Sequence, residues 1–147
     1  MYLRRDLYRV PTNFKWVMCM AKRSKLEELV GKVVVSPDEI WAKVEGNPSA
    51  LLVRVGITEK LQRELGNIEF VRVLPKGRYV GRGYPFGSIE SGRRIVLLRA
   101  PISGSIQEVN EELRADPTLL NKDPTGKGWV AVFRPINLEE EIEQLAK

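Results

Sequence analysis

Apolar and polar positions alternate over short stretches of this chain, which is the pattern of half-buried β-strands. The alternation predicts strands at residues 33–35, 40–45, 50–55, 68–73, 84–89, 95–99, 105–109 and 129–133. Glycine or proline stands in most of the connections, as tight turns require. The sequence therefore predicts a mainly β fold of short antiparallel strands, arranged as a sandwich or a partly closed barrel.

Small helices are predicted at the periphery from residues that cap helix N-termini. The candidate starts are Ser24, Thr58, Asn110, Asp116 and Asn137. A glutamate follows both Ser24 and Asn137 three residues later, which is the spacing of a capping box. Each helix is expected to lie on the β-structure with one apolar face.

The same alternation predicts which side chains form the core. The predicted core residues are Val53, Val55, Ile57, Leu61, Leu65, Phe70, Val73, Phe86, Ile95, Leu97, Val109, Leu120, Val130 and Val132. Trp129 stands between Gly128 and an apolar strand, so we expect it to be mostly buried.

Composition excludes several classes of function. The 147 residues suffice for one domain with an appendage. The chain has no histidine and one cysteine, which excludes Ser-His-Asp triads, the common zinc sites and an intrachain disulfide. Cys19 lies in an apolar run and is expected to be a buried, inert thiol.

Positive charge is concentrated in the first 37 residues. This segment holds eight lysines and arginines against three acids, and the rest of the chain is neutral. Ser36, Pro37 and Asp38 form a break after this segment, so we predict a basic extension at residues 1–37 and a domain at residues 38–147. The extension is either a solvated flank or an arm that docks on an acidic partner, nucleic acid or lipid headgroups.

Apolar runs are too short to cross a membrane, and the start of the chain lacks the pattern of a secretory signal. A cytoplasmic protein is therefore expected. Arginine, glycine and aromatic residues interleave over residues 77–84, as in proteins that bind single-stranded nucleic acid. Tight turns with arginine on their rim account for this run equally well. A nucleic-acid-binding module that uses this rim and the basic extension stays an alternative interpretation.

Two segments in register carry a family resemblance. Residues 86–91 (FGSIES) and, at the same spacing, residues 100–104 (APISG) closely resemble the lipoyl hairpin of the glycine cleavage system H protein. Further matches in order are residues 55–58, 65–66, 109–110, 119–121, 123–124 and 126–129, whereas Thr125 stands where a tyrosine is common in the family. Trp41 stands where the family has the tryptophan of its His-Glu-Trp signature.

The resemblance implies a flattened barrel-sandwich of two small antiparallel sheets, whose hairpin tip presents a lysine that bears lipoate. In that family the arm carries an aminomethyl group between glycine decarboxylase, the aminomethyltransferase and dihydrolipoamide dehydrogenase. The chemistry then belongs to the cofactor and the partner enzymes.

The position of the lipoyl lysine falls on Arg93 in this chain, and no lysine occurs between Lys76 and Lys122. A guanidinium stays protonated and delocalised, so it is not expected to accept lipoate. We therefore predict a divergent H-protein-like binding or regulatory module without lipoate, whose hairpin tip faces protein partners. The tip comprises Glu90, Ser91, Gly92, Arg93 and Arg94. A carrier modified at another residue is the remaining alternative, and the sequence leaves a homo-oligomer open.

Overall fold

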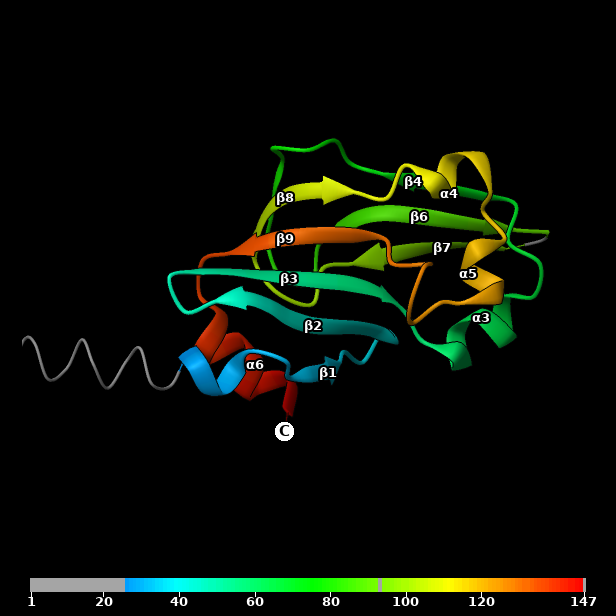
Figure 1. Ribbon diagram of the computed structural model, residues 1–147. Coiled ribbons are helices and arrows are strands. Elements are labelled where there is room, and N and C mark those ends of the chain that lie inside the picture. Colours follow the sequence, from blue (N-terminus) through cyan, green and yellow to red (C-terminus); the bar gives the residue numbers. More distant parts are fainter. Residues whose placement is uncertain (1–25, 93, 147) are drawn as a thin grey trace, which may run out of the picture.

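The computed structural model describes residues 26–92 and 94–146, which form two antiparallel β-sheets with small helices around them (Figure 1). The larger sheet has the order β1-β2-β3-β9-β8-β5, and the smaller one has the order β4-β6-β7. The strands are β1 (Val33–Val35), β2 (Ile40–Asn47), β3 (Ala50–Ile57), β4 (Phe70–Val73), β5 (Tyr79–Val80), β6 (Pro85–Ser91), β7 (Arg94–Arg99), β8 (Gly104–Val109) and β9 (Ala131–Pro135). The predicted mainly β architecture is confirmed.

The helices are short. They are α3 (Glu59–Leu65), α4 (Glu112–Ala115), α5 (Leu119–Lys122) and α6 (Leu138–Ala146), and residues 26–29 form one further helical turn. None of the helices in the described ranges is long and apolar enough to span a membrane.

Only some of the predicted capping residues start a helix. The helices α4 and α5 begin after Glu111 and Thr118, whereas the predicted caps Asn110 and Asp116 each accept a hydrogen bond from the backbone N two residues later. The Thr58 hydroxyl accepts a hydrogen bond from Leu61 N at 3.2 Å, and α3 ends at Gly66, whose φ of 71° suits glycine. Asn137 contacts Glu140 through Nδ2 and Oε2 at 3.1 Å, so the capping-box pair at the start of α6 meets. The predicted pair at Ser24 lies outside the described residues, as does Cys19.

The two sheets enclose the core between their inner faces. Phe86 from the smaller sheet meets Phe133 from the larger one edge to face, with 5.2 Å between ring centroids and 87° between ring planes. Both rings are fully buried. Edge-to-face packing of this kind adds to the free energy gained by burying the rings. The sheets are therefore joined by aromatic contact as well as by aliphatic packing.

Three predicted core residues lie on the surface instead. Phe70 is 56% exposed, Ile95 is 67% exposed and Leu97 is 48% exposed. On β4 the side chains of Val71 and Val73 point toward the core, so that of Phe70, which alternates with them, points outward. Ile95 and Leu97 share the outer face of the smaller sheet with Phe70. Periodicity predicted every strand of the described residues except the two-residue β5, but it assigned these three residues to the wrong face, because alternation alone does not say which face is covered.

Other core predictions hold in part. Trp129, predicted to be mostly buried, is only half-buried, and the Arg54 guanidinium covers part of its ring, with Cζ 4.5 Å from the ring centroid. Val73 and Val109 are half-buried as well, and pack against the core from its margin. The remaining predicted core residues are buried.

The edge strand β1 comes from the predicted extension. Val33–Val35 pair with β2, so this part of residues 1–37 belongs to the larger sheet. Ser36 continues the connection, since its N donates to Ile40 O at 2.9 Å. Most of the basic charge lies in residues 1–25, outside the described residues. That the N-terminal extension can be removed from the domain therefore stays a prediction, and β1 is counted as part of the domain.

A pair of phenylalanine substitutions tests the placement of the core. Phe86→Ala removes a fully buried ring and should lower the free energy of unfolding by about 3–5 kcal/mol. Phe70→Ala deletes the same atoms from an exposed site and should cost about 1 kcal/mol or less. Chemical denaturation of both variants measures the difference, and equal losses would contradict the assignment of the two faces.

Candidate functional site

The hairpin of β6 and β7 places the predicted tip residues at one end of the smaller sheet. Ser91 pairs with Arg94, which leaves a two-residue connection between the strands. Gly92 adopts a φ of +44°, a left-handed conformation that suits glycine at a tight hairpin turn. Arg93, the other residue of this connection, lies outside the described residues. The turn is thus shorter than the predicted five-residue tip.

The described tip residues occupy different environments. Gly92 and Arg94 are exposed, and Glu90 is half-buried. Ser91 is only 3% exposed, and its hydroxyl has no hydrogen-bond partner within the described part of the chain. With no base to accept its proton, Ser91 has none of the features of an activated nucleophile.

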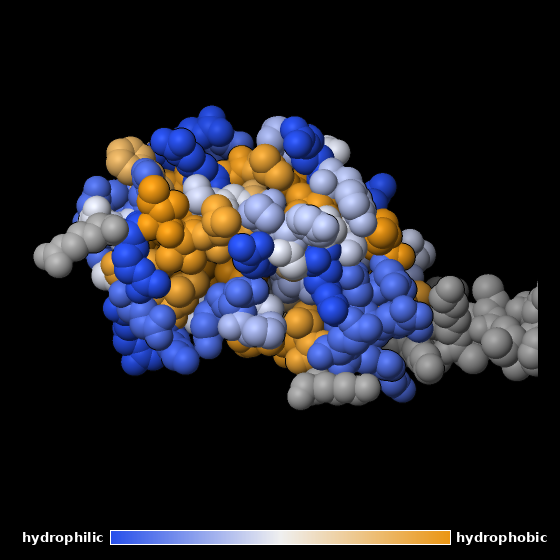
Figure 2. Space-filling model, turned by 180° about the vertical axis from the view of Figure 1, so that it is seen from behind, coloured by the Kyte–Doolittle hydropathy of each residue, from blue (hydrophilic) through white to orange (hydrophobic). Residues whose placement is uncertain are grey.

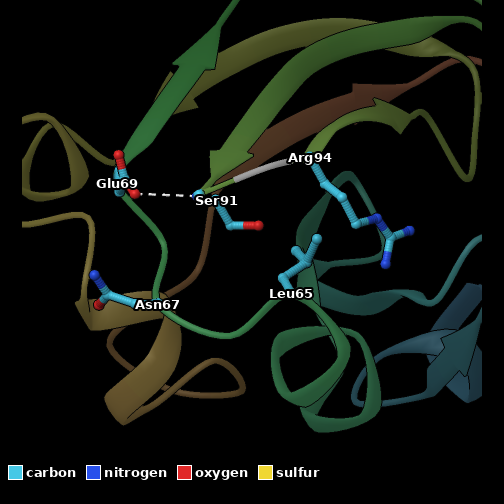
Figure 3. Close-up of a pocket in the computed structure, with 6 residues that line it drawn as sticks. Leu65, Asn67, Glu69, Ser91 and Arg94 are labelled. Carbon is cyan, nitrogen blue, oxygen red and sulfur yellow. Dashed lines mark hydrogen bonds between the residues drawn. The ribbon is translucent and has the colours of Figure 1, made fainter.

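Glu69, which directly precedes β4, holds the turn between β6 and β7 through two hydrogen bonds. Its backbone N donates to Glu90 O at 2.9 Å, and its carboxylate Oε1 accepts from Gly92 N at 3.0 Å (Figure 3). One residue therefore holds both the last part of β6 and the turn itself. Glu69 was not predicted from the sequence, because the contact joins residues 23 positions apart and leaves no local pattern.

Asn121 in turn fixes the segment that leads to Glu69. Its Oδ1 accepts from Ile68 N at 2.9 Å, and its Nδ2 donates to Gly66 O at 2.6 Å and to Gln62 Oε1 at 3.0 Å. These bonds tie α5 to the end of α3 and to the start of β4. Asn121 thus fixes Ile68, and the next residue, Glu69, bonds to the hairpin turn.

The turn before α5 also has a favourable electrostatic arrangement. Asp116 accepts hydrogen bonds from the hydroxyl and the backbone N of Thr118, and its Oδ2 lies 3.7 Å from Lys122 Nζ. The Thr118 hydroxyl, followed by the charge of Lys122, lowers the pKa of Asp116. Asp116 therefore stays ionised and helps to order the helix that carries Asn121.

An open pocket of about 320 Å³ lies between the hairpin turn and the end of α3 (Figure 3). It is lined by Leu65, Asn67, Glu69, Ser91, Gly92 and Arg94. Its charged side chains are one carboxylate and one guanidinium. In the described ranges no group of three or more acidic or cysteine side chains could hold a metal ion. The arrangement suits recognition of a partner better than catalysis.

Other residues of the resembling motifs hold the fold. Trp41 Nε1 donates to Pro124 O at 3.0 Å, and its ring packs so closely on Gly56 that a Cβ there would lie 2.6 Å from Cζ2. Asn110 Nδ2 donates to Lys127 O at 3.0 Å and to Trp129 O at 2.7 Å. The motif residues outside the hairpin are therefore explained by packing and backbone hydrogen bonds.

Comparison with known proteins gives a consistent result. The family model for the glycine cleavage H-protein matches residues 33–147. Glycine cleavage system H protein 2 of Aquifex aeolicus is 37% identical over 127 residues, which are 82% of this chain and 77% of the relative. The H protein of Anoxybacillus flavithermus is 43% identical over 105 residues, covering 71% of this chain and 80% of the relative.

A solved structure agrees with the fold. The crystal structure of a glycine cleavage system H protein from Mycobacterium marinum superposes with a TM-score of 0.64 at 31% sequence identity. The match covers 80% of this chain and 98% of that protein. These matches do not favour the nucleic-acid alternative.

Substitution of Glu69 tests the brace. Glu69→Ala removes the acceptor for Gly92 N–H, and a lost hydrogen bond of about 1 kcal/mol should speed exchange of that amide proton by about fivefold. Glu69→Gln keeps an amide oxygen as acceptor and should change the rate less. Amide exchange followed by NMR gives both rates. Equal rates in the natural protein and in Glu69→Ala would show that the carboxylate does not order the turn.

Proposed function

The chain belongs to the glycine cleavage H-protein family, and from that premise we propose that it is a noncatalytic binding or regulatory module that carries no lipoate. It presents the hairpin tip, residues 90–94, to enzymes that act on lipoate or take part in glycine cleavage. Its role is recognition, and any bond-making chemistry belongs to its partners.

The residue at position 93 carries this proposal. Lipoate is attached through an amide, which requires an amine that can lose a proton and attack an activated acyl group. Arg93 offers a guanidinium, which stays protonated and whose lone pairs are delocalised. Its neighbour Arg94 is also an arginine, so a shift of register by one residue brings no amine to the tip. The tip as it stands does not fit the cofactor.

The rest of the hairpin supports recognition as the retained role. The turn is ordered by Glu69 and Gly92, and neither contact depends on the side chain at position 93. Glu90 and Ser91 match the residues that flank the lysine in the family's hairpin. A partner that reads the hairpin backbone and these flanking residues still finds them in place, with two arginines added beside them.

Mass spectrometry of the natural protein tests the absence of lipoate. The intact protein isolated from its host should have the mass of the polypeptide without a lipoyl group. Digestion and peptide mapping then cover every lysine, which addresses the alternative of a carrier modified elsewhere. Lipoate found on any lysine overturns the proposal.

Restoring the amine tests whether the hairpin is still recognised. A lipoate–protein ligase should add one lipoyl group to Arg93→Lys and none to the natural chain. Arg93→Lys with Arg94→Ala is the second variant, because Arg94 brings a like charge to the new amine. Gly92 is kept in both, since its φ of +44° disfavours a branched side chain. If both variants fold, by circular dichroism, and neither is modified, the proposed recognition by lipoate-handling enzymes is wrong.

The basic extension is proposed as a docking element for anionic surfaces. Deleting residues 1–25 removes seven cations and one acid, which changes the net charge from +5 to −1. The truncated chain should keep its thermal midpoint and lose retention on an anionic resin. Deleting residues 1–37 also removes β1 and should lower the midpoint. A loss of folding on removing residues 1–25 alone contradicts this division.

A further inference from the structure

The outer edge of β7 is an unpaired sheet edge. This strand pairs with β6 alone, and no backbone hydrogen bond in the described residues reaches its other side. Glu90 O accepts from Glu69 N on the β4 side, so the backbone groups of Glu90 point away from β7. Ile95, directly opposite Glu90, therefore points its own N–H and C=O to the free edge, and so does Leu97 two residues later.

The side chains beside this edge are apolar and exposed. Ile95 is 67% exposed and Leu97 is 48% exposed, and Phe70 lies in the same cross-strand row as Ile95 at 56%. Figure 2 shows that apolar surface and strongly hydrophilic side chains alternate on the back of the molecule. An edge with both free backbone groups and exposed apolar side chains is a template for strand addition.

Arginines determine which strand fits. β7 begins at Arg94 and ends at Arg99, both exposed, and Arg72 stands in the same cross-strand row as Leu97 on the outer face. One guanidinium nitrogen of Arg99, Nη1, donates to Gly83 O at 3.1 Å. Glu90 is the one carboxylate in these rows. The free edge is therefore apolar in its centre and positively charged at both ends.

Charge disfavours two segments of the chain itself as the strand that pairs with the β7 edge, namely β7 of a second copy and residues 1–25. In an antiparallel pairing of two copies, the Arg94 end of one β7 meets the Arg99 end of the other, and like charges repel across strands. Residues 1–25 carry seven lysines and arginines against Asp6 as the one acid, so they are repelled by the same arginines. A partner segment with carboxylates is attracted by these arginines instead of being repelled.

We propose that the β7 edge binds an extended segment of a partner protein, apolar in the centre and acidic at both ends, as a fourth strand of the smaller sheet. The backbone groups of Ile95 and Leu97 pair with the added strand, whose central side chains cover the two exposed apolar ones. Carboxylates at its ends reach Arg94 and Arg99. This site is separate from the question of lipoate, because it uses the strand and not the residue at position 93.

Two synthetic peptides test the proposal on the full chain. The acidic probe is acetyl-Glu-Glu-Val-Thr-Val-Thr-Val-Glu-Glu with a fluorescent label, and its control has lysine in place of each glutamate. Fluorescence anisotropy should give at least tenfold tighter binding of the acidic peptide. In NMR exchange measurements that peptide should slow the amides of Ile95 and Leu97 at least tenfold, and leave the β1 edge unchanged.

Three variants locate the site. Leu97→Pro removes an edge donor that β6 does not use, and should weaken binding of the acidic peptide at least tenfold. Arg94→Glu, which leaves the backbone intact, should weaken the acidic peptide and strengthen the basic one. Ile95→Ser should weaken binding several-fold, whereas Ile136→Ser changes an equally exposed side chain elsewhere and should have no effect.

Several results would overturn the proposal. Equal affinity for the two peptides would show that the arginines do not select the partner. Amides of β7 that stay unprotected at saturating peptide would show that the added strand does not pair with this edge. Protection of these amides in the absence of peptide, together with a dimeric mass in sedimentation, would assign the edge to a second copy of the chain. None of these results depends on lipoylation, so they are distinguishable from a failure of the proposed function.

Discussion

The packing of two small sheets across one thin core is the constraint on which the rest of this structure depends. A single sheet cannot bury its own apolar face, and the contact of Phe86 with Phe133 marks where the two inner faces cover each other. Once the inner faces are covered, β6 and β7 can extend beyond the core as a hairpin. The position of the tip is thus a consequence of core packing, whereas its local shape is set by contacts outside the core.

These outside contacts form an ordered chain of polar groups. Asn121 holds the backbone at Gly66 and Ile68, and Glu69 then holds Glu90 and Gly92. Hydrogen bonds that satisfy backbone groups in this way favour one arrangement of the turn over its alternatives. The hairpin is therefore presented in a defined geometry even though its tip is exposed, which is what a recognition surface requires.

Local sequence signals predicted most of the helices and strands, but they did not reveal features that depend on contacts between residues far apart in the sequence. Thr58 starts α3 as its side chain indicates, because capping acts over three residues. Phe70 was assigned to the core from the alternation of apolar and polar positions, yet its strand turns the next residue inward. Glu69 and Asn121 could not be found, since their partners lie 23 and 53 residues away in the sequence. The tip was found only through a family resemblance, not through periodicity or charge.

The contacts that hold the hairpin turn do not involve the side chain at position 93, so this side chain can change without loss of the fold. The turn is held by Gly92 and by Glu69, and both contacts are made by backbone atoms of the hairpin. An exposed side chain at a hairpin tip buries little surface, so its exchange changes stability by a few tenths of a kcal/mol. The hairpin can therefore stay folded whichever side chain stands at this position. What persists is a rigid, arginine-bearing surface on a strand whose outer edge is still free to pair.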